Sequence, residues 1–110
     1  MENKVACLNL SKNQIKDQGA TKLCRLLRKT ALIHLDIGQN KITTNGFGVI
    51  FKTLETNIHL ISLKLGNDES SNINKLGVQG SAYLKTLLFK QAENGGVLAN
   101  LNLKWLQIGD

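Results

Sequence analysis

One short pattern of apolar residues, L-x-x-L-x-I-x-x-N-x-I, recurs along this chain and constrains its fold more than any other feature. The clearest copy is residues 32–42, and a second copy lies 27 residues earlier, at residues 5–15. The apolar half of the pattern returns at residues 60–65 and 98–103. Four copies within 110 residues predict a protein built from stacked repeats.

The last two apolar residues of each copy alternate with polar residues, which is the period of a β-strand. We expect these side chains to point into the core: Leu8, Leu10, Leu35, Ile37, Leu63, Leu65, Leu101 and Leu103. One unit holds too little apolar surface to fold alone, so neighbouring units are expected to stack. Asn13 and Asn40 follow at the turn, where a short amide side chain can bond unpaired backbone groups. We therefore expect a ladder of Asn residues, with ordinary solvated turn residues as the alternative.

The second half of each unit has the i, i+3, i+4, i+7 spacing of an amphipathic helix. We expect helices at about residues 18–29, after residue 44, and at about residues 81–91. Their predicted buried residues are Ala20, Leu23, Cys24, Leu27, Phe47, Ile50, Phe51, Leu54, Leu84 and Leu88. Lys85 replaces the position of Cys24 and Phe51, which indicates a thinner core or a shifted third helix.

Two further positions recur at the start of the first two predicted helices. Asp17 and Thr44 are predicted to be N-caps, because short polar side chains can bond the free N–H groups of a first helical turn. Gly19 and Gly46 lie 27 residues apart, at a site where close approach of the backbone requires a missing side chain.

The third unit is irregular because the polar residues 66–74 interrupt it. Residues 74–80 match residues 40–46, but the offset between the units grows from 28 to 34, so about six residues are inserted. The polar composition predicts a loop on the rim of the repeat. Asp68 and Glu69 are too few for a calcium loop, so we expect no metal there.

The end of the sequence departs from the pattern as well. Leu106 occupies the place of the turn Asn, so the ladder is expected to break there. Trp105 either covers the uncapped end of the core or serves as a contact anchor for a partner. The predicted units of this single domain are residues 1–31, 32–59, 60–97 and a truncated 98–110, about three and a half repeats. Repeat arrays normally carry polar caps, so we expect a fragment of a longer array, with end-to-end self-association through the uncapped ends as a further expectation.

The sequences at residues 8–20 and 35–47 resemble the ribonuclease-inhibitor-like subclass of leucine-rich repeat proteins. The residues that carry this resemblance are Leu8, Asn13, Ile15, Gly19, Leu35, Asn40, Ile42 and Gly46. The resemblance covers nearly the whole chain and implies an α/β solenoid: a short right-handed horseshoe arc with parallel strands on the concave side and helices on the convex side. The family includes ribonuclease inhibitors, sensor regions of innate-immune receptors, pointed-end actin regulators and Ran GTPase-activating proteins, so the resemblance is specific for fold and weak for function.

Basic residues gather at the start of the chain. The net charge is +6, and the first 30 residues hold seven basic residues against two acidic ones. Four of these bases fall on the first predicted helix: Lys22, Arg25, Arg28 and Lys29. They are either a basic patch for nucleic acid, an acidic protein surface or anionic lipid, or a solvated helix face, since Lys and Arg also favour helix. No aromatic residues interleave with these bases to stack on nucleotides.

The compartment is predicted from the cysteines and from the hydropathy. Cys7 and Cys24 show no metal-ligand spacing and are expected to point apart, so we predict no disulfide and a small buried apolar role for Cys24. The first residues are not followed by the apolar run of a signal peptide. No stretch approaches the roughly 20 apolar residues of a membrane span. These features predict a cytoplasmic protein with no membrane partner.

Residues between the buried strand positions are expected to form columns on the concave surface, about 4.8 Å apart. The predicted partner-binding residues are His34, Asp36, Ser62, Lys64, Asn100, Asn102, Lys104 and Trp105. Asp36 and Lys64 are neighbours that can pair, and Gly38 and Gly66 are expected to leave the rim open for close approach. A flat surface of mixed charge suits protein recognition better than a small-molecule pocket. We therefore expect an interaction module with a protein partner.

We predict no catalytic residue, no metal ligand and no cofactor. The enzymatic alternative in the family that the chain resembles is GTPase activation, where a loop Arg or Asn supports hydrolysis. Neither residues 11–16 nor residues 66–74 contain Arg, and both Arg25 and Arg28 fall on the first predicted helix. The sequence thus favours protein binding through the concave strand face, with nucleic-acid or acidic-surface binding through the basic first helix as the alternative.

Overall fold

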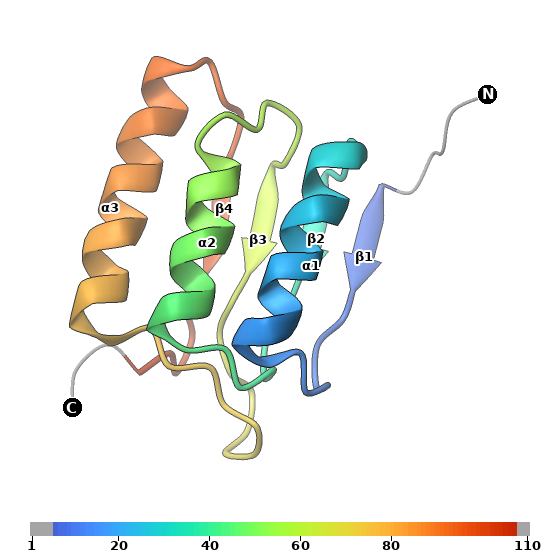
Figure 1. The fold of residues 1–110 in the computed structure, drawn as a ribbon, viewed down its shortest axis with the longest axis vertical. Coiled ribbons are helices and arrows are strands. Elements are labelled where there is room, and N and C mark those ends of the chain that lie inside the picture. Colours follow the sequence, from blue (N-terminus) through green and yellow to red (C-terminus); the bar gives the residue numbers. More distant parts are fainter. Residues whose placement is uncertain (1–5, 108–110) are drawn as a thin grey trace.

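The computed structural model describes residues 6–107, in which strands and helices alternate along the chain. The elements are β1 (Cys7–Asn9), α1 (Lys16–Lys29), β2 (His34–Asp36), α2 (Thr44–Leu54), β3 (Ser62–Lys64), α3 (Gly77–Glu93) and β4 (Asn100–Asn102). The helices lie side by side in chain order and cover the strands from one side (Figure 1). This arrangement confirms the prediction of an α/β repeat fold.

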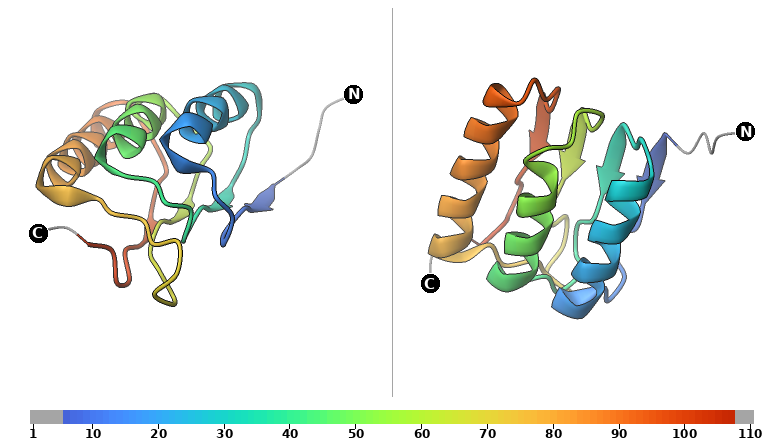
Figure 2. Two further views of the ribbon diagram at one scale, coloured as in Figure 1. Left: turned by 60° about the horizontal axis from the view of Figure 1, so that its bottom comes forward. Right: turned by 45° about the horizontal axis from the view of Figure 1, so that its top comes forward.

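The four strands form one parallel sheet in the order β1-β2-β3-β4. The central residues Leu8, Leu35, Leu63 and Leu101 are aligned across the sheet, as the repeat spacing predicts. The helices lie on one face of the sheet and leave the other face open (Figure 2). Leu35 and Leu63 are 2% and 1% exposed, whereas Leu8 and Leu101 are only partly buried because each lies on an outer strand.

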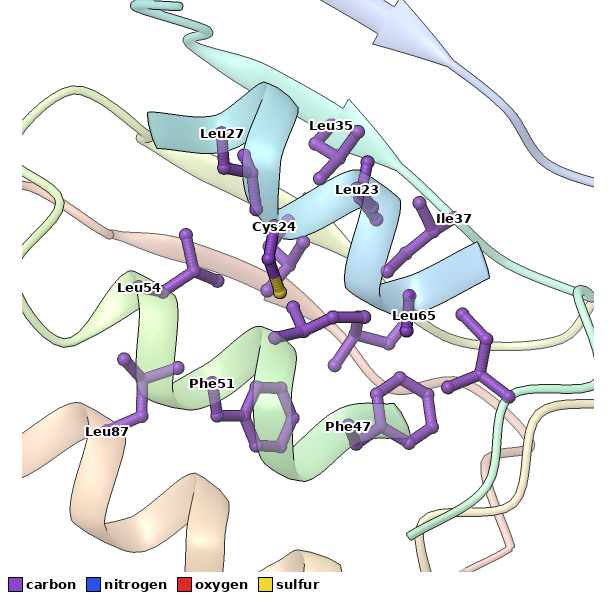
Figure 3. Packing of buried hydrophobic residues seen from close by; sticks show 14 of the residues in the cluster. Leu23, Cys24, Leu27, Leu35, Ile37, Phe47, Phe51, Leu54, Leu65 and Leu87 are labelled. Carbon is purple, nitrogen blue, oxygen red and sulfur yellow. The ribbon is translucent and has the colours of Figure 1, made fainter. Parts of the chain in front are cut away.

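The hydrophobic core lies between the sheet and the helices (Figure 3). All the buried positions predicted for the first two helices are confirmed: Ala20, Leu23, Cys24, Leu27, Phe47, Ile50, Phe51 and Leu54. The rings of Phe47 and Phe51 stack with their centroids 5.6 Å apart. Burying one large apolar side chain contributes about 1.5–3 kcal/mol, so these residues hold the helices on the sheet. Cys24 is buried and Cys7 is exposed, and both thiols are free, as predicted.

An asparagine row, Asn13, Asn40 and Asn74, joins the turns that follow the strands. Asn40 is fully buried, and its Nδ2 group donates at 2.9 to 3.1 Å to the carbonyls of Leu10, Ile37 and Gly38. Its Oδ1 atom accepts from the backbone N–H groups of Asn13 and Ile15. Asn74 makes the equivalent bonds one unit later, accepting from the N–H groups of Asn40 and Ile42. The predicted ladder is confirmed, and it continues past the inserted residues.

The two predicted N-caps are wrong. Residue 15 precedes α1 and residue 43 precedes α2, and neither helix has a side-chain hydrogen bond at its cap. Asp17 lies inside α1 and accepts at 2.7 Å from the backbone N–H of Thr43, in the next unit. Thr44 lies inside α2 and donates at 2.7 Å to the carbonyl of Leu76, again in the next unit. Both polar side chains therefore bridge neighbouring units, because the stack brings those partners within reach.

The prediction that Leu88 is buried is also wrong, since this side chain is 45% exposed. Leu88 stands at the repeat position of the buried Leu27 and Leu54, whose helices are each followed by another helix, whereas no helix of residues 6–107 packs beyond α3. The buried residues of α3 are Gly80, Leu84, Leu87 and Gln91; the first two keep the repeat positions of Gly46 and Ile50 in α2, whereas Leu87 and Gln91 do not. Lys85 is exposed at the repeat position where Cys24 and Phe51 are buried, so this position adds nothing to the core in the third unit.

Trp105 does not cover the end of the core. Its indole is 65% exposed, whereas the next side chain, Leu106, is 8% exposed and belongs to the hydrophobic cluster. Trp105 has a left-handed backbone (φ 53°), as do Lys12 (60°) and Gln39 (53°) at the same repeat position. The fourth unit therefore begins its turn like the first two, and this turn carries Leu106 inward and Trp105 outward.

Among residues 6–107, no helix is both long enough and apolar enough to cross a membrane.

Candidate functional site

The open face of the sheet, which we call the strand face, carries two rows of polar side chains. The first row is Cys7, His34, Ser62 and Asn100, and the second is Asn9, Asp36, Lys64 and Asn102. The register of all four strands confirms that the residues between the buried strand positions form columns. His34 and Asn100 are exposed and Ser62 is half-buried. Their side chains make no hydrogen bond to another residue in 6–107, which leaves the first row free to contact a partner.

The second row has a structural role that the sequence reading missed. Asn9, Asp36 and Asn102 each accept at 2.9 to 3.0 Å from the backbone N–H two residues later. These bonds hold the start of each turn, as Asn and Asp side chains do in Asx turns. The signal was present in the sequence, because an Asn or Asp recurs two residues before three of the four turns. The second row is therefore partly occupied by contacts within the chain.

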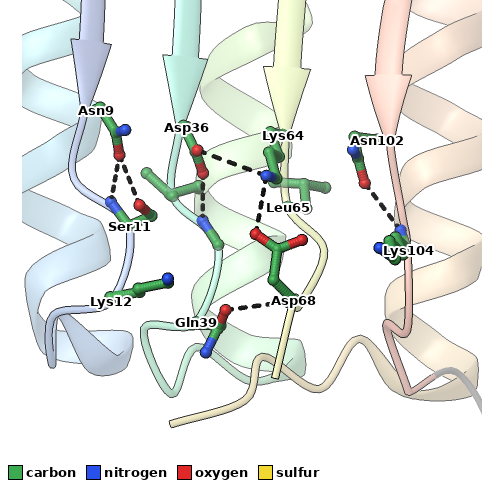
Figure 4. A network of polar contacts seen from close by, with 12 residues as sticks. Asn9, Ser11, Lys12, Asp36, Gln39, Lys64, Leu65, Asp68, Asn102 and Lys104 are labelled. Carbon is green, nitrogen blue, oxygen red and sulfur yellow. Dashed lines mark hydrogen bonds and ion pairs between the residues drawn. The ribbon is translucent and has the colours of Figure 1, made fainter. Parts of the chain in front are cut away.

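Lys64 is the exception in the second row, and it forms the charged centre of the strand face (Figure 4). Its Nζ atom lies 3.1 Å from Asp68 Oδ2 and 4.0 Å from Asp36 Oδ2. The predicted pairing of Asp36 and Lys64 is thus confirmed, but the closer partner is Asp68 in the inserted loop. With one ammonium group between two carboxylates, the charges of this cluster are paired and one negative charge is left in excess.

The pair formed by Lys64 and Asp68 also shifts the protonation of both groups. The hydrogen bond to Asp68 raises the pKa of Lys64 above its ordinary value of 10.5, and the carboxylate of Asp36 acts in the same direction against partial desolvation. The same hydrogen bond lowers the pKa of Asp68 below its ordinary value of 3.8. Both groups therefore stay charged throughout the neutral range.

The inserted loop, residues 66–74, is held against the neighbouring unit. Gln39 is 2% exposed, accepts from the backbone N–H of Asp68 at 2.9 Å and donates to the carbonyl of Ser71 at 3.1 Å. Lys12 and Glu69 form an exposed ion pair at 3.6 Å. The predicted rim loop is confirmed. Its contacts place Asp68 and Glu69 beside the strand face, which the composition of the loop alone does not reveal.

The prediction that Gly38 and Gly66 leave the rim open is wrong. A Cβ atom on Gly38 would lie 2.4 Å from the carbonyl oxygen of Gly66, and one on Gly66 would lie 2.4 Å from that of Lys104. Real Cβ atoms do not approach backbone atoms so closely. The glycines allow consecutive turns of the chain to stack on one another, so the space beside them is already filled.

The remaining predicted residues fall on two separate surfaces. Lys104 and Trp105 lie beyond β4 at the rim, where the Lys104 Nζ atom is 5.3 Å from the centre of the indole ring in a cation–π contact. The four predicted basic residues, Lys22, Arg25, Arg28 and Lys29, are exposed on α1, in the helix layer. Since the helices cover the opposite face of the sheet (Figure 2), these bases do not join the strand-face residues in one site.

Within the described residues, no group of three or more His, Cys, Asp and Glu side chains is placed to hold a metal ion. The strand face offers aligned hydrogen-bonding groups, a cluster of paired charges and an exposed indole at its rim. Such a surface can bind by shape and by hydrogen bonding to another surface.

Comparison with known families agrees with this arrangement. Residues 3–24 match the family model of the leucine-rich repeat. No curated protein matches the chain. The matched segment covers β1, the following turn and the first part of α1, which together are most of one structural unit. With four parallel strands and three alternating helices, the match supports a leucine-rich repeat protein, a class whose domains commonly mediate protein–protein interactions.

Proposed function

We propose that this chain is a non-catalytic interaction module that binds a protein partner through its strand face. The observation that carries the proposal is the first row of the strand face. His34, Ser62 and Asn100 stand in register on three adjacent strands, about 4.8 Å apart, and their side chains make no hydrogen bonds within residues 6–107. Trp105 adds an exposed aromatic residue of the kind that often anchors protein interfaces.

The spacing of Leu, Asn and Gly favours the ribonuclease-inhibitor-like subclass, with the strand face as the concave side of a short horseshoe arc. We further propose that units 1–31, 32–59, 60–97 and 98–110 are part of a longer array, because Leu88 and Phe89 are 45% and 72% exposed where the next unit would stack. Two free cysteines fit a reducing cytoplasm.

The alternative function is nucleic-acid binding through α1, supported by the exposed bases Lys22, Arg25 and Lys29. Binding of this kind rests on phosphate contacts and weakens steeply as salt rises. It also requires no contribution from the strand face, which separates the two proposals experimentally.

Affinity capture from extract of source cells at moderate salt, with and without added nuclease, tests the proposal. The test variant is Ser62→Arg, which places a long side chain in the centre of the first row and breaks no hydrogen bond of the described residues. Ser70→Arg, on the exposed inserted loop, is the matched control. We expect one or more proteins that are captured by the wild type and the control and lost with Ser62→Arg. Capture that survives Ser62→Arg but disappears with nuclease would assign the function to α1.

A further inference from the structure

The helix layer contains a groove that the strand-face proposal does not use. It has a volume of about 710 Å³ and runs over α2 between α1 and α3. We call it the helix groove. The lining residues used below are Arg28, Gly48, Val49, Lys52, Glu55 and Tyr83.

Gly48 on α2 has no side chain, and this lets the ring of Tyr83 on α3 lie close to α2 and form one side of the groove. A Cβ atom at Gly48 would lie 3.2 Å from Cε2 of Tyr83. Val49 and Tyr83 are 43% and 38% exposed, so an aliphatic and an aromatic side chain face the groove from below and from one side. The sequence pattern gave no sign of this hollow, because Gly48 breaks no repeat rule.

Charge around the groove is predominantly basic. The helix α1 carries five basic residues and one acidic, α2 carries one basic, and α3 carries two basic and one acidic. The helix layer therefore holds the whole net charge of +6, since the other six basic and six acidic residues of the sequence cancel. Arg28 and Lys52 stand at the groove itself against a single acid, Glu55. The only hydrogen bond of the Arg28 guanidinium within residues 6–107 is a long one of 3.5 Å to Thr53, so it is available to a ligand.

We propose that the helix groove binds an amphipathic helical segment of a partner protein, apolar along one face and acidic along its flanks. Apolar side chains of that segment would contact Val49 and Tyr83, and its carboxylates would meet Arg28 and Lys52. A helix fits better than an extended peptide because the groove is lined by helices, which offer no free sheet edge to bond an extended backbone. A helix satisfies its own backbone hydrogen bonds and presents apolar anchors at i, i+3, i+4 and i+7. This site is independent of the strand face.

The test uses a phage-displayed library of helical peptides, selected on the full chain and read out with the synthetic peptide that is most enriched. We expect that peptide to carry apolar residues at helical spacing, flanked by Asp or Glu. Val49→Glu and Arg28→Glu should each weaken its binding about tenfold or more. The matched controls are Val78→Glu, an exposed valine on α3 outside the groove, and Arg25→Glu, an exposed arginine one turn earlier on α1. Both controls should bind within about twofold of wild type, and circular dichroism checks the fold of each variant.

Three results would overturn the proposal: no enriched peptide, enriched peptides that lack acidic residues, or equal effects of the groove variants and their controls. Equal loss with Arg25→Glu and Arg28→Glu, together with competition by an oligonucleotide, would assign the basic layer to nucleic acid instead. Ser62→Arg should leave peptide binding unchanged. A failure of the helix-groove proposal can therefore be told apart from a failure of the strand-face proposal.

Discussion

The strand face and the opposite surface, which is formed by the outer sides of the three described helices and which we call the helix face, differ in the arrangement of their charges. On the strand face, Lys64 lies between Asp36 and Asp68, and Lys12 pairs with Glu69, so each of these bases is paired with an acid. On the helix face the bases outnumber the acids and surround a groove. A face whose charges are already paired selects a partner by shape and hydrogen bonding, whereas a basic face attracts acidic partners from a distance. The two faces should therefore recognise different chemistry and respond differently to salt, pH and mutation.

The largest expected effect concerns the asparagine row, which joins the turns that connect the strands of one face to the helices of the other. Asn40→Ala would leave buried backbone groups without partners, each at a cost of about 1–3 kcal/mol, so we expect the free energy of unfolding to fall by about 3 kcal/mol. Asn13→Ala is the matched control at the exposed end of the same row and should cost less than about 1 kcal/mol. Urea denaturation of both variants measures the difference. Equal losses would mean that the row does not act through burial.

The two faces should differ in how strongly added salt weakens the binding of their ligands. Raising the salt from about 50 to about 500 mM should weaken the acidic helical peptide about tenfold, because the Debye length falls to a few ångströms. A strand-face partner should lose less than about threefold, since the charges there are already paired within the chain. Isothermal titration of each ligand at both salt concentrations provides the comparison. A strand-face partner with the steeper salt dependence would reverse this assignment of the faces.

Asp36 has two roles on the strand face, and two substitutions tell them apart. Asp36→Asn keeps an acceptor for the backbone N–H of Gly38, as Asn9 and Asn102 do in their own turns. It removes only a half-exposed ion pair, so the free energy of unfolding should change by less than about 0.5 kcal/mol. Asp36→Ala also removes the turn bond and should cost about 1 kcal/mol. Thermal unfolding of the two variants side by side shows whether the turn bond or the charge matters more.

The smallest effect is the pH response of the inserted loop. The hydrogen bond to Lys64 lowers the pKa of Asp68 below 3.8, so its contribution is complete above that pH and is lost as the pH falls through the shifted pKa. At the alkaline end, the pKa of Lys64 is raised above 10.5, so its contribution is lost only as the pH rises through that higher value. An NMR titration of the Asp68 carboxyl should give a midpoint below 3.8, and Lys64→Met should move the midpoint upward. An unchanged midpoint would mean that the pair does not form in solution.

The repeat pattern predicted those features that every unit shares. Leu35 and Leu63 are aligned as expected, and Asn40 is part of the expected ladder. Residues at equivalent positions of consecutive repeats lie next to each other when the repeats stack. The burial prediction for Leu88 was wrong because its burial depends on whether another helix packs against α3, which its own sequence position does not determine. The N-cap prediction for Asp17 was wrong because the same type of polar side chain can cap its own helix or accept a hydrogen bond from the next unit, as Asp17 does.

The candidate sites were predicted less completely than the fold. The rows of the strand face followed from alternation, but the contact of Lys64 with Asp68 depends on how the inserted loop folds back over Gln39. The helix groove depends on Gly48 and Tyr83, which lie in different units and follow no shared pattern. Contacts between irregular parts of the chain leave no periodic signal, and this is why both features appear only in three dimensions.

The most direct test of the strand-face proposal is a hydroxyl-radical footprint of the chain in complex with the protein recovered by affinity capture. Each face carries reactive aromatic or imidazole side chains that are exposed in the free chain: His34 and Trp105 on and beside the strand face, and Tyr83 and Phe89 on the helix side. We expect the partner to protect His34 and Trp105 while Tyr83 and Phe89 are oxidised as in the free chain. Protection of Tyr83 with no change at His34 would contradict the proposal and place the partner on the helices.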